Sequence, residues 1–304
     1  MSAFLARRVL QAVAVVLLVT LIVFGLLRLG PGSDRAQLVG TGAAHSAFLL
    51  QYLSWLGQVL HGNLGFSTTP AEPVTTLLAN ALPRTLVLTG LSTLIALLVA
   101  IPAGIVQAVR RSTATDHAIR TLTYIWYGMP SFVLGYVLIL IFALHLHWFG
   151  PEGPQDSGIG GVLTDWQDLT LPVLTLSLAT IAIFARYMRS AAADSLDEEY
   201  VEAARARGAG ERRVLLRHVL RNSLVPVVTL LGLSIPQILG GALIVESLFN
   251  FPGMGWQIWQ AALNHNLPVV LGFTLVIGVG AAIGSLLADI GYALLDPRVR
   301  YQRA

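Results

Sequence analysis

The sequence predicts an all-α protein that crosses a membrane six times. Hydrophobic residues make up 55% and charged residues only 12% of its 304 residues, and the mean hydropathy is +0.71. Apolar stretches long enough to cross a hydrocarbon layer of about 30 Å recur along the chain. This composition indicates a polytopic membrane protein and argues against a soluble enzyme. The absence of cysteine excludes disulfides and thiolate chemistry.

The first predicted span lies within residues 1–29, which begin with Arg7-Arg8 and remain apolar to Leu27. This run is too long for an ordinary signal-peptide core, so we expect a retained helix. Residues 30–84 are mixed in polarity and rich in turn-forming residues. Within them, Gln51–Leu60 has helical periodicity and two aromatic side chains, which predicts a helix lying at the outer interface.

Five further apolar stretches complete the predicted set of spans. We predict two parts: residues 1–84, with the first span and an extracytoplasmic segment, and residues 85–304, with the other five spans and a cytosolic loop at about 194–222. The five spans are expected at about Thr85–Val109, Ile119–Phe149, Leu171–Met188, Leu224–Leu248 and Val269–Leu295.

The distribution of arginine predicts the orientation. All 19 basic residues are arginine, and with the amino terminus inside, sixteen of them fall in inner segments. Only Arg28, Arg35 and Arg84 would lie outside. The positive-inside rule therefore favours cytoplasmic amino and carboxyl termini. Attraction to anionic lipid explains the clustering of arginine beside span ends better than nucleic-acid binding does.

The most charged stretch, residues 194–226, predicts two short helices around a glycine bend. Ser195 and Glu198 have the spacing of a capping box at a helix start. We expect that helix to end at Gly208, where glycine permits a left-handed exit, and a second helix to begin near Glu211. Two short helices between two spans would form a small rigid knob on the aqueous side.

This loop carries a resemblance to a known family. Glu202-Ala203-Ala204, followed after three residues by Gly208, resembles the EAA loop of the permease subunits of binding-protein-dependent ABC importers. Where the family motif usually continues with Ile-x-Leu-Pro, this chain has His218-Val-Leu-Arg221, and a proline follows later, at Pro226. The segment 217–226 resembles the dipeptide/oligopeptide branch rather than the sugar branch.

Three further segments resemble peptide-type permeases. Glu246-x-x-Phe249-x-x-Pro252-Gly253-x-Gly255 is similar to a segment at the extracytoplasmic end of the fifth span in that family. Residues 296–300, Asp-Pro-Arg-Val-Arg, are similar to its carboxyl end. Residues 61–67 resemble its Gly-Asp-Leu-Gly-x-Ser turn, with Asn63 in the usual aspartate position. The resemblance covers the whole chain, most firmly residues 85–300.

The resemblance implies a type I ABC importer permease with a MetI-like fold in a bacterial or archaeal cell membrane. It would pass di- or oligopeptides from a binding protein across the membrane by alternating access. The implied partners are a homologous second permease, two cytoplasmic ATPases, an extracytoplasmic substrate-binding protein and membrane lipid. ATP and Mg²⁺ would be held by the ATPases, and this chain would bind no cofactor and catalyse no reaction. The positions implied for ATPase coupling are Glu202, Ala203, Ala204, Arg207, Gly208 and Arg213.

The residues of the transport path are less closely defined. An ionisable Glu246 at the outer end of a span is a functional candidate, but it could equally cap backbone amides of the turn 249–255. Prolines at positions 102, 130, 226 and 236 can each bend a helix and free a carbonyl. Nearby polar side chains could line a wet path or simply bond within the helix bundle. The gate and path candidates are Glu246, Phe249, Pro252, Gly253, Ser234, Gln237 and Ser131.

Other functions find less support. Without lysine the chain cannot contain a Gly-x-x-x-x-Gly-Lys phosphate loop, so we expect it not to hydrolyse ATP itself. His145 and His147 would not share a helix face, so a metal pair there is not expected. For Asp289 we expect an arginine partner rather than a path role. A membrane enzyme would need a catalytic motif that the sequence lacks. The alternatives left open are nickel, glutathione or oligosaccharide as cargo, or a passive channel or scaffold.

Overall fold

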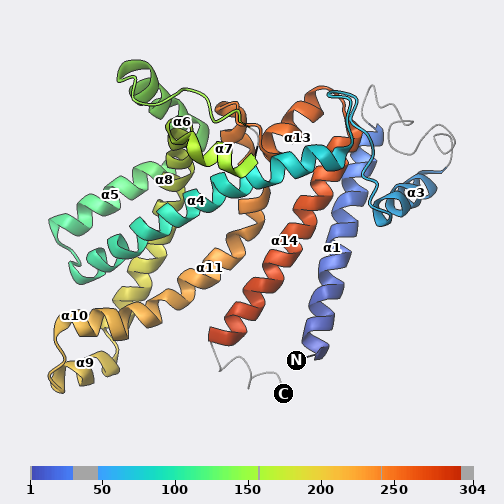
Figure 1. Cartoon of the computed structure of the whole chain (residues 1–304). Helices are drawn as coiled ribbons and strands as arrows, with labels where there is room; N and C mark the ends of the chain where they lie inside the picture. Colours follow the sequence, from blue (N-terminus) through green and yellow to red (C-terminus); the bar gives the residue numbers. More distant parts are fainter. Residues whose placement is uncertain (1, 30–46, 157, 241, 296–304) are drawn as a thin grey trace. The chain divides into compact units, whose positions relative to one another are not determined.

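The computed structural model describes residues 2–29, 47–156, 158–240 and 242–295. Apart from one isolated bridge between Phe66 and Pro73, its regular elements are helices (Figure 1). The predicted all-α fold is confirmed. The helices are α1 Ser2–Leu29, α3 Phe48–Leu60, α4 Val74–Val109, α5 Ala114–Gly128, α6 Ser131–Leu138, η1 Ile139–His145, α7 Gly158–Thr164, α8 Trp166–Leu196, α9 Glu199–Ala206, α10 Glu211–Arg213, η2 Val214–Val219, α11 Leu220–Gly240, α12 Leu243–Leu248, α13 Met254–Leu263 and α14 Leu267–Leu295.

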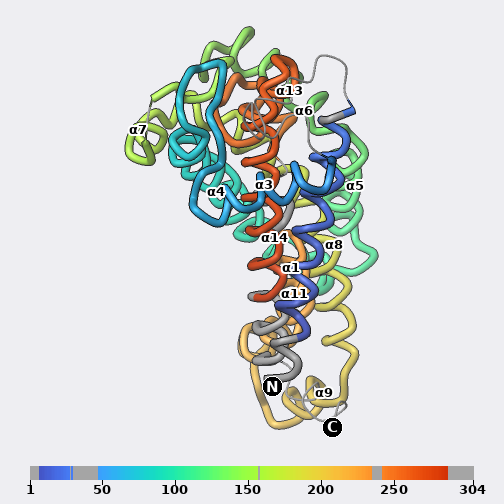
Figure 2. Tube along the Cα trace, turned by 90° about the vertical axis from the view of Figure 1, so that its right-hand side faces the viewer, coloured from blue at the N-terminus to red at the C-terminus, as the bar shows by residue number. Residues whose placement is uncertain are grey.

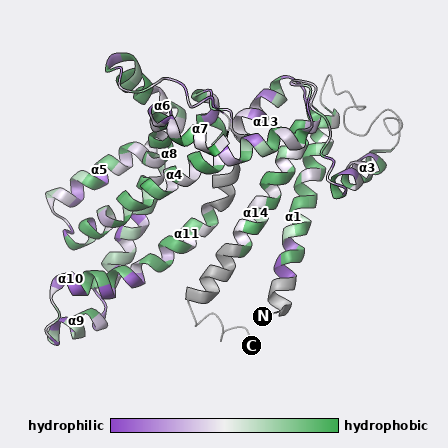
Figure 3. Cartoon of the chain, in the orientation of Figure 1, coloured by the Kyte–Doolittle hydropathy of each residue, from purple (hydrophilic) through white to green (hydrophobic). Residues whose placement is uncertain are grey.

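Five helical segments are long and apolar enough to cross a membrane: Arg7–Leu27, Val74–Val109, Trp166–Leu196, Glu211–Ser234 and Leu267–Leu286. A sixth crossing is available if α5 and the α6–η1 helix form one broken span. Figure 3 shows mostly apolar colouring over the coloured parts of α1 and α14, and a larger share of polar colouring over α9 and α10. A polytopic arrangement, predicted from hydropathy, follows directly from these lengths.

The third predicted span, Ile119–Phe149, is bent at Pro130, one of the prolines expected to bend a helix. α5 and the α6–η1 helix meet at an angle of 107°. Pro130 is the cause, because a proline restricts the residue before it to extended backbone, and Met129 has ψ of 129°. The chain therefore turns sharply there and then continues in α6 as a new helix.

The fifth predicted span, Leu224–Leu248, is wrong in its outer part. α11 ends at Gly240, and α12 is a separate six-residue helix that contains Glu246. The sequence has two consecutive glycines at this point: Gly240, the last residue of α11, and residue 241. Because glycine weakens a helix interior, an apolar run that reads as continuous can divide at this point.

The chain divides into two compact units. The first comprises Met1–Val87, Glu152–Trp166 and Ile235–Leu286, and the second comprises Leu88–Pro151, Gln167–Ser234 and Leu287–Ala304. In the first unit α1 and α14 lie side by side (Figures 1 and 2). Between them Phe24 packs against Leu271, and its ring meets that of Tyr52 from α3 edge-on at 5.7 Å. The expected helix at Gln51–Leu60 is confirmed as α3.

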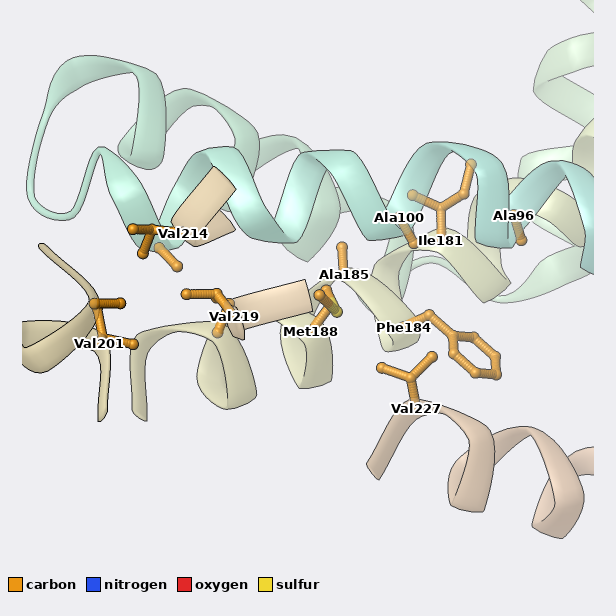
Figure 4. Close-up of a cluster of buried hydrophobic side chains, with 13 residues drawn as sticks. Ala96, Ala100, Ile181, Phe184, Ala185, Met188, Val201, Val214, Val219 and Val227 are labelled. Carbon is orange, nitrogen blue, oxygen red and sulfur yellow. The ribbon is translucent and has the colours of Figure 1, made fainter. Parts of the chain in front are cut away.

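The core of the second unit joins α4, α8, α9, η2 and α11. Figure 4 shows its side chains, which run from Ala96 and Phe184 through Met188 to Val201 and Val214. α4 and α8 approach closely, since a Cβ placed on Gly104 would lie only 2.6 Å from the Met188 side chain. This close approach holds the two long helices together at the level of the core.

Candidate functional site

The charged knob predicted around Gly208 is formed by α9, the turn 207–210, α10 and η2. It lies between the carboxyl-terminal end of α8 and the amino-terminal end of α11 (Figures 1 and 2). The predicted capping box is wrong. α8 runs through Ser195, whose buried hydroxyl accepts a hydrogen bond from Tyr200 at 3.0 Å, and α9 begins after Glu198, whose side chain caps nothing. α8 therefore ends at Leu196, eight residues beyond the expected end of the span at Met188.

The glycine bend is formed as expected. Gly208 has φ of +81°, in the left-handed region that glycine favours, and no other group lies within 4 Å of the position a Cβ would occupy. α10 then begins at Glu211, as predicted. Arg205 donates to both carboxylate oxygens of Glu211, at 2.9 and 3.3 Å, which closes the turn on its exposed side.

Apolar side chains anchor the knob to the long helices. Val201 of α9 and Val214 and Val219 of η2 are fully buried, in one continuous cluster with Met188 and Ala192 of α8 (Figure 4). α9 is too short to be stable alone, so this packing gives it its fixed position. α9 is therefore held against the core that also contains residues of α8 and α11.

The residues of the Glu-Ala-Ala motif face in different directions. Glu202 is exposed, Ala203 is half-buried, and Ala204, only 8% exposed, packs into the chain's own core. Arg207 and Arg213 are exposed. The motif thus offers an acidic side chain outward, while Ala204 lets α9 lie close to α8 and η2. Their role in coupling stays a prediction.

A second constellation surrounds Glu246 in the first unit. Its carboxylate, fully buried, accepts hydrogen bonds from the Thr85 hydroxyl at 2.7 Å, from the Trp256 amide at 3.0 Å and from the Gly255 amide. α12 lies outside the spans found above, and burial raises the pKa of Glu246 while these three donors oppose that rise. Of the two roles considered for Glu246, a functional group of the transport path or a cap for backbone amides, these contacts match the cap.

The glycines next to this carboxylate are required by close approach. A Cβ on Gly253 would lie 2.5 Å from Glu246 Oε2, and one on Gly255 would lie 2.4 Å from the Leu243 backbone. Phe249 is fully buried, and its carbonyl accepts from the Gly153 amide at 2.6 Å. The Glu-x-x-Phe-x-x-Pro-Gly-x-Gly pattern is thus a compact turn closed around one buried carboxylate.

Arg84 and Thr85, neither predicted as a site residue, tie α4 to this turn. Arg84 is 8% exposed and donates to the carbonyls of Pro252 at 3.3 Å and Asp156 at 2.9 Å. The Thr85 hydroxyl, besides donating to Glu246, accepts from the Met254 amide at 2.8 Å. The sequence placed Arg84 just before a span and gave no signal for this contact, because only the structure extends α4 back to Val74.

Four of the predicted gate and path residues lie together in the turn described above: Glu246, Phe249, Pro252 and Gly253. Ser131 and Ser234 belong to the second unit. Ser234 donates to the Leu230 carbonyl one turn earlier in α11 at 2.8 Å, so its hydroxyl is satisfied within its own helix. Ser131 begins α6. The side chains of Gln237 and Asp289 lie outside the described residues, as does the whole segment 296–300.

A buried ion pair in the second unit also escaped the sequence reasoning. Arg189 of α8 binds Asp116 of α5 through two hydrogen bonds of 2.9 Å each, and Asp116 is 1% exposed. The Ser112 amide donates to the same carboxylate at 3.1 Å. No group of three or more metal-ligating His, Asp or Glu side chains occurs in the described part of the chain.

Comparison with known proteins identifies the family. Residues 100–301 match the model of the binding-protein-dependent transport system inner membrane component. The chain belongs to this family. That segment contains both the knob and the turn around Glu246, and membership makes the chain a multi-pass component of an ABC importer, whose ATPase and binding protein are separate partners.

Relatives match over nearly the whole chain. The chain is 34% identical to the oligopeptide transport system permease protein AppB of Bacillus subtilis over 316 residues, covering 99% of this chain and 100% of that one. It is 35% identical to a putative peptide permease protein of Brucella ovis, covering 99% of each chain. It is 33% identical to a probable peptide ABC transporter permease of Sinorhizobium fredii, with 99% and 100% covered.

Two solved structures resemble the fold. An inward-facing MetNI methionine ABC transporter matches with a TM-score of 0.57 and 18% identity, over 74% of this chain and 99% of that one. An amino acid ABC transporter with histidines matches with a TM-score of 0.50 and 18% identity, over 74% and 94%. The expected type I permease fold is confirmed.

Proposed function

We propose that the chain is the permease subunit of an importer for di- or oligopeptides. It acts with a homologous second permease, two cytoplasmic ATPases that hold ATP and Mg²⁺, and an extracytoplasmic binding protein. Three relatives that match over almost their whole length are named as peptide permeases, which supports this cargo. The arginine distribution supports an orientation with both termini and the knob in the cytosol.

The observation that carries the mechanism is the anchoring of α9. Its exposed face presents Glu202, while Val201 and Ala204 pack into the core that contains α8 and α11. Closure of the ATPases would move the knob, and the core would transmit that movement to the spans. Transport then requires that the knob binds the open and closed ATPases with different free energies, because equal binding would shift no equilibrium.

The turn around Glu246 serves the opposite, extracytoplasmic side in this proposal. Its buried carboxylate fixes the start of α13 and the end of α12 in one geometry. Held in this way, the surface formed by these helices is preorganised for contact with the binding protein or for closing the path.

The first test is a pull-down of the tagged chain, expressed with its partners, from mild detergent. We expect an ATPase and a second permease with wild type, and loss of the ATPase alone with Glu202→Ala or Gly208→Val. Both variants should remain in the membrane while peptide uptake falls. A wild-type chain that purifies alone, like both variants, would overturn the coupling role and favour the channel or scaffold alternative.

A further inference from the structure

A cavity in the second unit is lined by three arginines. It measures about 200 Å³ and lies among α4, α5 and α8, with Arg120, Arg186 and Arg189 on its wall together with Tyr124, Tyr127 and Gln107. Its lining residues, all of them described, include no carboxylate. A cavity with this excess of positive charge is suited to an anion.

The charges around the cavity are only partly neutralised within the chain. The ion pair of Asp116 is with Arg189, and neither Arg120 nor Arg186 forms an ion pair with a carboxylate among the described residues. Arg120 contacts the Nδ1 atom of His117, and an imidazole ring does not neutralise the charge of the arginine. The net charge facing the cavity is therefore positive.

Arg186 is held in place while its donors stay free. Its guanidinium carbon lies 5.0 Å from the Tyr127 ring centroid and 5.8 Å from that of Tyr187. These contacts use the faces of the rings and leave the N–H groups of Arg186 unbonded to any described residue. A planar fork of free donors, oriented in advance, matches the oxygens of a phosphate group.

The position of the cavity favours a lipid as the source of that phosphate. Arg186 lies ten residues before the end of α8 at Leu196, which corresponds to roughly 15 Å along the helix. Gln107 lies near the end of α4, and Tyr124 and Tyr127 are 56% and 55% exposed. With the proposed orientation, this is the cytosolic part of the spans, where basic pockets between helices bind anionic headgroups and tyrosines favour the interface.

We propose that this cavity binds the phosphate group of an anionic lipid headgroup from the inner leaflet, with Arg186 and Arg120 as its ligands. Free phosphate offers the same chemistry, so the source has to be separated by experiment. The assignment uses the proposed orientation but needs neither ATPase coupling nor peptide transport. A bound headgroup would bridge α5 and α8.

The test is native mass spectrometry of the full chain in mild detergent, titrated with palmitoyl-oleoyl phosphatidylglycerol, with the matching phosphatidylcholine, and with inorganic phosphate. We expect one phosphatidylglycerol bound about tenfold more tightly than phosphatidylcholine, and about tenfold weaker binding in Arg186→Gln, as for loss of one charged hydrogen-bond donor. Arg110→Gln is the matched control, because it removes the same charge from an exposed arginine at the end of α4 outside the cavity. Arg186→Lys, which keeps the charge but not the planar fork, should fall between wild type and Arg186→Gln.

The possible outcomes of these titrations separate a lipid source from a soluble source of phosphate. Phosphatidylglycerol binding that depends on Arg186 but not on Arg110 supports the lipid site. Inorganic phosphate binding with the same dependence, without preference for phosphatidylglycerol, supports the phosphate site and assigns a soluble source. Equal binding of phosphatidylglycerol and of inorganic phosphate in Arg186→Gln and Arg110→Gln overturns the proposal. Because no arm measures uptake, failure here leaves the importer function untouched.

Discussion

Replacing Gly208 with alanine is expected to weaken the knob specifically through its backbone. Gly208 has φ of +81°, and nothing lies within 4 Å of a Cβ built there, so the substitution introduces strain without any steric clash. The left-handed conformation costs an L-residue about 1–2 kcal/mol. We therefore expect the local equilibrium between ordered and open α9 to shift toward the open state by a factor of about 5–30.

The neighbouring glycine provides a matched control. Gly210 also has an unobstructed Cβ position, but its φ is −65°, which alanine adopts without strain. Both alanines restrict the unfolded chain, a gain of about 0.4–1 kcal/mol that cancels between the two variants. The difference between Gly208→Ala and Gly210→Ala thus isolates the cost of the left-handed bend. Gly208→Asn should lie between them, because asparagine tolerates this conformation.

The assay is hydrogen exchange of the α9 amides in the assembled complex, paired with peptide uptake. Faster exchange confined to α9 and the turn, with lower uptake, is expected for Gly208→Ala alone. Equal exchange in the two alanine variants would refute the reasoning about the bend. Faster exchange in Gly208→Ala with unchanged uptake would keep that reasoning and refute the role of a rigid knob in coupling.

Three further substitutions test the contacts that fix the fold, each measured as the melting temperature of the purified protein in detergent. Glu246→Gln should lower the melting temperature, because the new amide NH₂ would face the N–H donors at the start of α13 and leave one of these donors unpaired. An unpaired buried donor costs about 1–3 kcal/mol of stability. An unchanged melting temperature would argue against a charged acceptor at this position. Gly253→Ala should destabilise the fold by about 1–3 kcal/mol, because the added methyl group overpacks the contact with Glu246. Gly90→Ala, on an open helical surface, is the control and should be neutral or stabilising. Equal effects of the two substitutions would contradict the close approach of Gly253 to Glu246. Asp116→Asn breaks a buried ion pair and should destabilise the fold by about 3–5 kcal/mol. Asp197→Asn, which breaks an exposed ion pair, is the comparison and should cost only about 0–1 kcal/mol. Similar losses in the two variants would show that Asp116 is not effectively buried.

The spans and the bend could be recognised from sequence because their causes are local. Crossing a hydrocarbon layer needs only a run of apolar residues, and a left-handed helix exit favours glycine, so α4, α8 and Gly208 were found where expected. The Glu-Ala-Ala spacing likewise placed the knob. Helix boundaries were less well predicted: α4 begins at Val74 rather than Thr85, and α8 ends at Leu196 rather than Met188.

The contacts that fix the two units could be decided only by the tertiary structure. Thr85 and Glu246 are 161 positions apart, and Asp116 and Arg189 are 73 apart. Nothing in the neighbourhood of either residue in the chain indicates its partner, because the pairing depends on how separate helices pack. Hydropathy reports whether a segment prefers lipid, whereas the direction in which Ala204, Arg84 or Arg186 faces is set by the helices around it.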